Sequence, residues 1–292
     1  MRRKRRSDWL GYLYLLPAVI FFTAFVVVPA VQTFWYSFWD WNGLTDAVWA
    51  GVSNFGRMVT EPLLSGAVIH SVVLLVFFAV LPVILGLLVT MLLGYRGRRG
   101  MTVYRTAFFL PQVVALVAIG VIWRWMYSTS GPLEQVLRAI GLHGPQEGWL
   151  GNFDTALPAV GLIGTWLLYG VCVTLFLSGA QKIDPDLYNA ASVDGAGQFR
   201  QFLAVTMPGL RREIALAMTI TGIAALASFD LVYTATNGGP GNETTVPGLL
   251  VYRLGFTNGR VGAASAVAVG LTLIMAVYVL IINKVSSNGD EE

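Results

Sequence analysis

The chain of 292 residues is poor in charge, cysteine and histidine. Charged residues make up only 12% of it, about half of the share that is usual in soluble domains. A single cysteine excludes a disulfide-stabilised scaffold, and two histidines far apart in sequence do not favour a zinc site. The chain also lacks a Gly-x-x-x-x-Gly-Lys-Ser/Thr loop, which excludes ATP binding by a P-loop.

The chain is instead rich in long apolar runs. Apolar residues make up 55% of it, which indicates an integral membrane protein, and long continuous runs favour helices over barrel strands. A helix needs about 20 apolar residues to cross the roughly 30 Å hydrocarbon layer. The sequence therefore predicts an all-α membrane protein with six transmembrane helices, at about Leu10–Val31, Val68–Leu93, Arg105–Trp125, Ala156–Ala180, Arg212–Val232 and Val261–Ile282.

The positive charges predict the orientation of these spans. Most of the 19 Lys and Arg residues lie at the N-terminus, in the second-to-third and fourth-to-fifth connections, and after the last span. Because such residues gather on the cytoplasmic side, both termini are expected to be cytoplasmic. The net charge is only +3 and is spread over small clusters, so a nucleic-acid partner is not expected.

The predicted spans hold few ionisable side chains. Glu213 and Asp230 lie near opposite ends of the fifth span. Ion-driven carriers usually bury several such groups near the midplane of the membrane. The sequence therefore describes a pathway without its own source of energy and no enzyme active site, although an ion-coupled secondary transporter remains the alternative.

The longest cytoplasmic connection, residues 181–212, carries recognisable helix signals. Asp184 is a predicted N-cap and Pro185 the first helical residue. Asp194 and Gly195 predict a turn that ends this helix, and a second helix leads to Pro208, which marks entry to the fifth span. The pattern predicts a helix–turn–helix hairpin whose small residues let another surface approach closely.

This hairpin resembles the EAA motif, roughly Tyr-Glu-Ala-Ala-x-x-Asp-Gly-Ala followed by a proline, of a known family. The family comprises permease subunits of binding-protein-dependent type I ABC importers, of the maltose-type group that takes up carbohydrates. Asn189 stands where the family usually has Glu, so the hydrogen-bonding capacity is kept and the charge is lost. The matching residues are Tyr188, Asn189, Ala190, Ala191, Asp194, Gly195, Ala196 and Pro208.

The resemblance implies one transmembrane permease domain over residues 1–292, in the plasma membrane of a bacterium. It implies that the hairpin docks into a separate ATPase, present in two copies, which binds and hydrolyses Mg-ATP. This chain is then expected to bind no cofactor itself. The other expected partners are a second permease, commonly a different chain, an extracellular solute-binding protein and the lipid bilayer.

A small set of polar and aromatic residues is predicted to contact the solute. Asp230 and Tyr233 can bond sugar hydroxyls, and Trp166 and Tyr169 can stack on a sugar face. Asn237 lies in a Gly-rich turn that either reaches the mouth of the pathway or is a plain connector. Trp and Tyr are equally typical of membrane-interface anchors, and Asp230 could instead cap a helix. The solute expected is a mono- or oligosaccharide, with a polyol or glycerophosphate-type solute left open.

Overall fold

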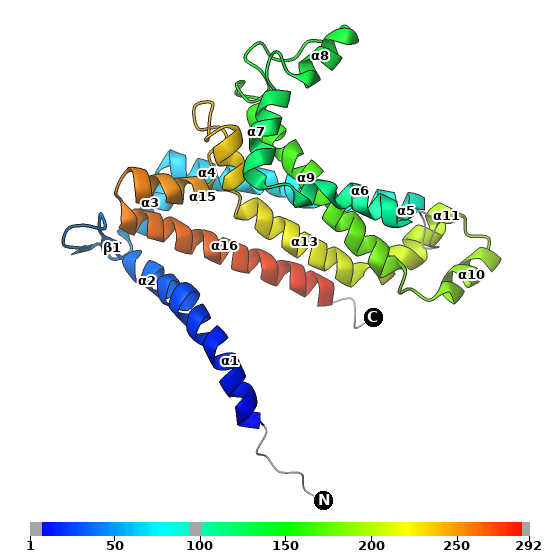
Figure 1. The fold of residues 1–292 in the computed structure, drawn as a ribbon, viewed down its shortest axis with the longest axis horizontal. Helices are drawn as coiled ribbons and strands as arrows, with labels where there is room; N and C mark the ends of the chain where they lie inside the picture. Colours follow the sequence, from blue (N-terminus) through cyan, green and yellow to red (C-terminus); the bar gives the residue numbers. More distant parts are fainter. Residues whose placement is uncertain (1–7, 94–100, 288–292) are drawn as a thin grey trace, which may run out of the picture. The chain divides into compact units, whose positions relative to one another are not determined.

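The computed structural model describes residues 8–93 and 101–287, which are mostly α-helical (Figure 1). The basic residues 2–6 and Arg96, Arg98 and Arg99, on which much of the predicted orientation depends, lie outside the described residues. The chain divides into two compact units, one made of residues 1–60 and 251–270 and the other of residues 61–250 and 271–292.

The first unit begins with a long apolar helix. It is continuous through a π-helical turn and ends at Tyr36, five residues beyond the apolar run expected to end at Val31. Its apolar side chains are exposed along almost the whole length, as a surface facing lipid or a partner requires. The elements are α1 (Asp8–Phe22), η1 (Thr23–Val27) and α2 (Val28–Tyr36).

An aromatic β-hairpin that the sequence did not predict follows this helix. Strands β1 (Trp39–Asp40) and β2 (Val48–Trp49) are antiparallel, and the Trp39 and Trp49 rings meet edge to face, 5.2 Å between centroids. Helix α3 (Ser53–Thr60) is joined to it because the Asn54 amide donates to the carbonyl oxygens of Ser37 and Trp39, at 3.0 and 2.9 Å. The turn η4 (Arg253–Thr257) and the start of α16 complete the unit.

The second unit contains most of the helices. One helical run covers α4, η2 and α5 and begins six residues before the expected Val68, because Pro62 provides its first turn. Helix α9 has the same bounds as the apolar run in the sequence. The elements are α4 (Pro62–Leu75), η2 (Val76–Val80), α5 (Leu81–Leu93), α6 (Met101–Val113), α7 (Leu116–Met126), α8 (Pro132–Ala139), α9 (Ala156–Ala180), α10 (Pro185–Val193), α11 (Gln198–Gln201), η3 (Phe202–Thr206), α12 (Met207–Gly209), α13 (Arg211–Leu226), α14 (Asp230–Ala235), α15 (Pro247–Tyr252) and α16 (Val261–Ser287).

Two of the expected spans are broken in the structure. Helices α6 and α7 meet at an angle of 99°, since Pro111 cannot donate within α6 and Ala115 is extended. The expected fifth span stops at Leu226, the end of α13, and helix α14 starts afresh at Asp230. Within residues 8–93 and 101–287, four helices are long and apolar enough to cross a membrane, or five if the bent pair is counted as one span. The structure therefore does not confirm the six transmembrane helices that the sequence predicts.

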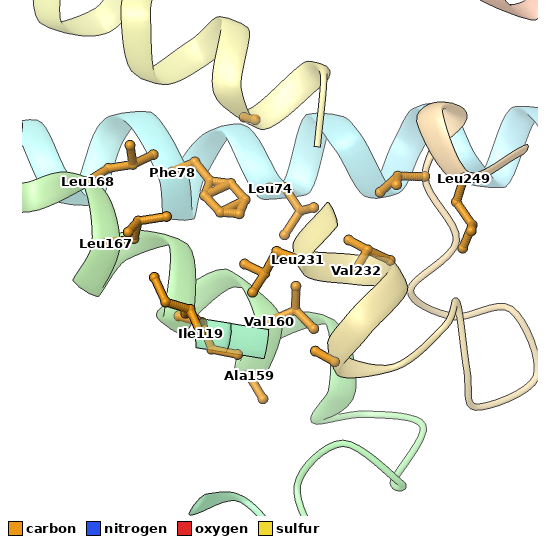
Figure 2. Packing of buried hydrophobic residues seen from close by; sticks show 14 of the residues in the cluster. Leu74, Phe78, Ile119, Ala159, Val160, Leu167, Leu168, Leu231, Val232 and Leu249 are labelled. Atoms are coloured by element: carbon orange, nitrogen blue, oxygen red, sulfur yellow. The ribbon is translucent and has the colours of Figure 1, made fainter. Parts of the chain in front are cut away.

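Helix α9 lies at the centre of the second unit's core. Its buried residues Val160, Ile163 and Leu168 pack against Leu74 and Phe78 of the α4–η2 run (Figure 2). Residues of α7 and α14 close the cluster from the other side. The broken elements α6–α7 and α13–α14 are thereby held against the same straight helix.

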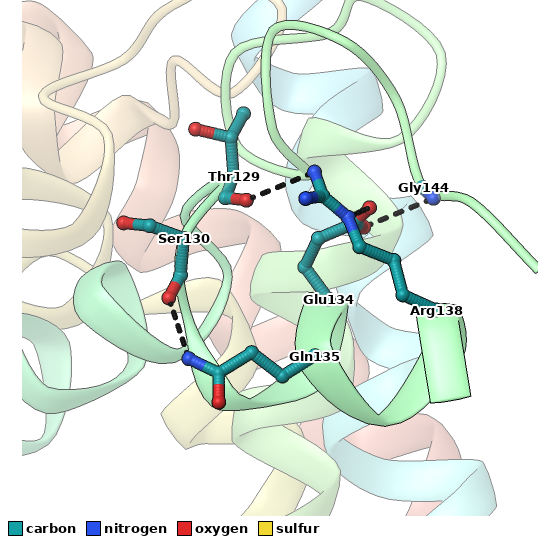
Figure 3. Close-up of polar contacts among 6 residues, drawn as sticks. All are labelled: Thr129, Ser130, Glu134, Gln135, Arg138 and Gly144. Atoms are coloured by element: carbon teal, nitrogen blue, oxygen red, sulfur yellow. Dashed lines mark hydrogen bonds and ion pairs between the residues drawn. The ribbon is translucent and has the colours of Figure 1, made fainter.

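The connection between α7 and α9 folds into a small polar lobe around Glu134 (Figure 3). Its buried carboxylate accepts hydrogen bonds from the Arg138 side chain at 2.9 Å and from the Gly144 amide at 3.0 Å. The hydrogen bond from Arg138, and then that from Gly144, lower the pKa of Glu134 despite its burial. The ionised carboxylate of Glu134 therefore holds together the connection between α7 and α9.

Candidate functional site: a helix–turn–helix hairpin and a polar cleft

The 181–212 segment forms the helix–turn–helix hairpin that its sequence predicts. The Asp184 carboxylate accepts a hydrogen bond from the amide of Asp186 at 2.9 Å, which caps α10. Asp194 ends the helix, and Gly195 follows with a φ of +78°, in the left-handed region that favours glycine. The chain then returns through α11, η3 and α12 to α13.

Side-chain hydrogen bonds make the hairpin a rigid unit. Tyr188 is only 1% exposed, and its hydroxyl lies 3.0 Å from the Thr206 hydroxyl on the returning arm. The Gln201 amide donates to the Ser192 hydroxyl at 2.9 Å and to the Ala196 carbonyl at 2.8 Å. Tyr188 therefore holds the two arms together from inside, and its partners Thr206 and Gln201 were not among the residues singled out in the sequence.

The other motif residues lie on or near the hairpin surface. Ala191 and Ala196 are half-buried, whereas Ala190, Asp194, Gly195 and Pro208 are exposed. Exposed apolar side chains surround them, namely Leu187, Val193 and Phe199. The hairpin thus presents small residues framed by apolar ones, a surface suited to close docking.

Asn189, the position that departs from the family motif, is exposed on α10. Its amide donates to the Asp186 carboxylate at 3.3 Å, one helical turn earlier. The side chain therefore lies along the helix and adds no charge to the docking surface.

A cleft with a mostly apolar lining and three polar residues, called the polar cleft below, lies where the two broken spans meet α9. Its volume is about 230 Å³. Gln112 near the end of α6, Ser228 in the α13–α14 break and Asp230 at the start of α14 supply polar groups, against apolar walls that include Phe78 and Leu167. Among the described residues that line the cleft, Asp230 is the only charged one. The breaks between α6 and α7 and between α13 and α14 leave these polar groups beside the cleft.

Of the five residues predicted to contact solute, only Asp230 lines this cleft. Trp166 packs edge to face on Trp123, with 5.5 Å between ring centroids. Tyr169 packs in the same manner on Phe108, at 5.8 Å.

The other two predicted residues, Tyr233 and Asn237, do not line the cleft either. Tyr233 is stacked at 5.4 Å on Phe229, which itself lines the cleft. Asn237 takes a left-handed conformation, with a φ of +48°, in the turn after α14. The structure therefore does not bring the five predicted residues together at one site.

The sequence analysis did not identify Gln112 and Ser228 as candidate site residues. The signal for Gln112 was its position after Pro111, which breaks an apolar run. The signal for Ser228 was its place in the least apolar of the expected spans, two residues before Asp230.

Comparisons with known proteins agree with this architecture. Residues 83–287 match the family described as "Binding-protein-dependent transport system inner membrane component". The chain is 32% identical to the probable ABC transporter permease protein YurN of Bacillus subtilis, over 97% of this chain and 98% of that protein. It is 33% identical to the diacetylchitobiose uptake system permease protein NgcF of Streptomyces coelicolor, over 100% and 87%.

A solved structure shares the fold. It is a chain of the bacterial alginate ABC transporter in complex with alginate pentasaccharide-bound periplasmic protein, with a TM-score of 0.80 at 22% identity over 96% of this chain and 95% of that one. The family match includes the whole hairpin and the polar cleft residues Gln112, Ser228 and Asp230. Neither the family nor these relatives support an ion-coupled carrier. The chain belongs to the family of binding-protein-dependent transport system inner membrane components, as a permease subunit of an ABC transporter.

Proposed function

We propose that this chain forms half of the pathway by which an ATP-driven importer takes up a carbohydrate. The observation that supports it best is the rigid hairpin over residues 184–208, with its capped helix, left-handed Gly195 and surface of small residues. The named relative NgcF belongs to a diacetylchitobiose uptake system, which favours a sugar as solute. Amide, hydroxyl and carboxylate groups against aromatic and aliphatic walls suit a polyhydroxylated ligand.

The proposed assembly needs partners for energy and for delivery. Two copies of an ATPase bind and hydrolyse Mg-ATP, and a second permease, commonly a different chain, supplies the other half of the pathway. An extracellular solute-binding protein delivers the sugar, a role suggested by the periplasmic protein that is bound in the complex of the related alginate transporter. Closure of the ATPase dimer moves the hairpin as a rigid body, and the helices attached to it change access to the cleft.

The proposed topology places the hairpin and both termini in the cytoplasm of a bacterium, with the 126–155 lobe outside. Cysteines at Arg98, Asn152 and Asn242 should report this through an impermeant thiol reagent in intact cells, because the native Cys172 is buried. We expect labelling at Asn152 and Asn242, and none at Arg98 until the cells are opened. Labelling of Arg98→Cys in intact cells, or of neither outer position, would contradict the orientation.

The function itself is tested in proteoliposomes that hold this chain, its second permease and the ATPase. Sugar uptake should require ATP and the solute-binding protein, and an ion gradient alone should not support it. Uptake driven by an ion gradient without ATP would favour a secondary carrier and contradict the proposal.

Asp230→Asn tests whether the cleft contacts the solute. Because the amide keeps the size and loses the charge that strengthens a hydrogen bond to a hydroxyl, we expect uptake to fall by about tenfold. Complex assembly and ATP turnover stimulated by loaded binding protein should stay near the wild-type values. Asp46→Asn, at an exposed carboxylate of the other unit, is the matched control and should transport normally. Wild-type uptake by Asp230→Asn would assign Asp230 to a structural role.

A further inference from the structure

Three helices of the second unit lie close to the segment that carries the hairpin. They are α5 (Leu81–Leu93), α9 (Ala156–Ala180) and α16 (Val261–Ser287). Side chains from residues 182–213 donate to backbone carbonyl groups of α5 and α16 and form an ion pair just after the end of α9.

The first contact joins the hairpin to α5. The Gln198 side chain, at the start of the returning arm, donates from Nε2 to the carbonyl oxygen of Met91 at 3.0 Å. Met91 lies in α5, and the two residues are 107 positions apart in the chain. Gln198 thus connects the hairpin to an element that is distant in sequence.

The second contact joins the hairpin's exit to α16. Arg211, the first residue of α13, donates from Nη2 to the carbonyl oxygen of Val285 at 2.8 Å. Val285 lies in α16, 74 positions along the chain from Arg211. The exit of the hairpin is therefore connected to a second helix that is distant in sequence.

The third contact closes the base of the hairpin. The Lys182 ammonium, just after α9, lies 3.6 Å from the Glu213 carboxylate in the first turn of α13. Both chain ends of the hairpin are therefore held near each other. Together with the Tyr188–Thr206 and Gln201 contacts inside it, this pair leaves the hairpin little freedom to deform when it is pushed.

We propose that Gln198 and Arg211 are the positioning residues that pass a displacement of the hairpin to α5 and α16, an inference that rests on the proposed function. A rigid hairpin transmits motion through the points at which it is attached. These two side chains attach it to two apolar helices distant in sequence, and covalent continuity already attaches it to α9 and α13. Losing either side chain leaves the docking surface in place and weakens the connection to one helix.

The partner atom in both contacts is a carbonyl oxygen, so a donor is required. Gln198→Met keeps the length and the neutral charge but has no donor. Gln198→Lys keeps a long side chain with a hydrogen-bond donor. Arg211→Met and Arg211→Lys form the same pair at the second position. A residue that matters only for side-chain volume would not separate Met from Lys in this manner. At Gln198, which is neutral, a role in surface charge would instead favour Met over Lys.

The experiment measures sugar taken up per ATP hydrolysed, with the complete complex in proteoliposomes, together with co-purification of the ATPase. For Gln198→Met and Arg211→Met we expect normal co-purification and ATP turnover. Sugar uptake per ATP should fall by about fivefold, the size expected when one hydrogen bond is lost. The two Lys variants should stay within about twofold of the wild type.

The outcomes separate this inference from the proposed function. If the wild type shows no ATP-dependent uptake, the proposed function is wrong. If the wild type couples and both Met variants transport as much sugar per ATP as the wild type does, only the inference is wrong. Loss of ATPase co-purification in the Met variants would place the two residues in docking and would also overturn it.

Discussion

Gly195→Trp is expected to abolish coupled transport while leaving the chain inserted and folded. Two effects act together. The φ of +78° at Gly195 is one that a residue with a Cβ adopts at a cost of about 1 kcal/mol. The position is also exposed, and a Cβ added there would have no neighbouring atom within 4 Å, so an indole ring would project from the turn into the proposed docking surface. Co-purification of the ATPase and sugar-stimulated ATP turnover measure the result.

Matched variants separate the two effects. Gly197 is also exposed with open space around it, but its φ of −67° suits any residue. Gly195→Ala should therefore destabilise the hairpin by about 1 kcal/mol, whereas Gly197→Ala should not carry that conformational cost. Normal assembly and normal uptake with Gly195→Trp would contradict the docking role of the hairpin, and with it the main support for the proposed coupling.

The hairpin could be predicted closely because its signals are local. Asp184 and Pro185 start α10, and Gly195 ends it, through interactions of neighbouring residues that a sequence shows directly. The bounds of α9 could be predicted equally well, since its apolar run is uninterrupted over 25 residues. In both cases the information needed lies within a few turns of one helix.

The breaks in the helices could not be predicted from the sequence in the same way. Pro111 indicates a disturbance in α6, but the angle of 99° to α7 depends on packing between distant segments, since α6 lies against α9 and α7 against α14. The break after Leu226 and the pairing of Trp39 with Trp49 likewise depend on contacts between distant parts of the chain. The sequence therefore predicted continuous spans where the structure has breaks.

The candidate site residues also divide into those that the sequence identifies and those that depend on their neighbours in the fold. Asp230 was identified because a carboxylate in an apolar run is unusual, and this reasoning is independent of geometry. Trp166 and Tyr169 were selected for their chemistry, yet their rings pack on Trp123 and Phe108 and do not line the cleft. Aromatic side chains serve packing and recognition equally well, so the sequence cannot separate the two uses without knowing their neighbours.

Gly164→Leu is expected to cause the largest loss of stability in the second unit. A Cβ at Gly164 would overlap the ring of Phe78, and one at the preceding Gly161 would overlap Phe77. The two rings come from the π-helical turn η2, where the Thr165 hydroxyl donates to the Phe77 carbonyl at 2.6 Å. Glycine on α9 is thus what lets η2 approach so closely.

The expected result follows from this packing. Phe78 is 3% exposed in the core cluster and also forms a wall of the polar cleft, so a leucine at Gly164 must displace the ring or push α9 away (Figure 2). Overpacking of this kind typically costs about 1–3 kcal/mol, and here it acts on the central helix. We expect little or no monodisperse complex after detergent extraction, or a clearly lower midpoint of thermal unfolding, and loss of uptake.

A second substitution shows whether the ring is the cause. Phe78→Ala removes the atoms that the new side chain would meet, so Gly164→Leu combined with Phe78→Ala should be more stable than Gly164→Leu alone, although Phe78→Ala by itself is destabilising. Such a sign reversal in a double-mutant cycle shows that the two positions are coupled, as residues in contact are. Equal thermal stability of wild type and Gly164→Leu, or simple additivity of the two changes, would mean that α9 and η2 do not meet through Gly164. The placement of Phe78 beside the cleft would then be wrong as well.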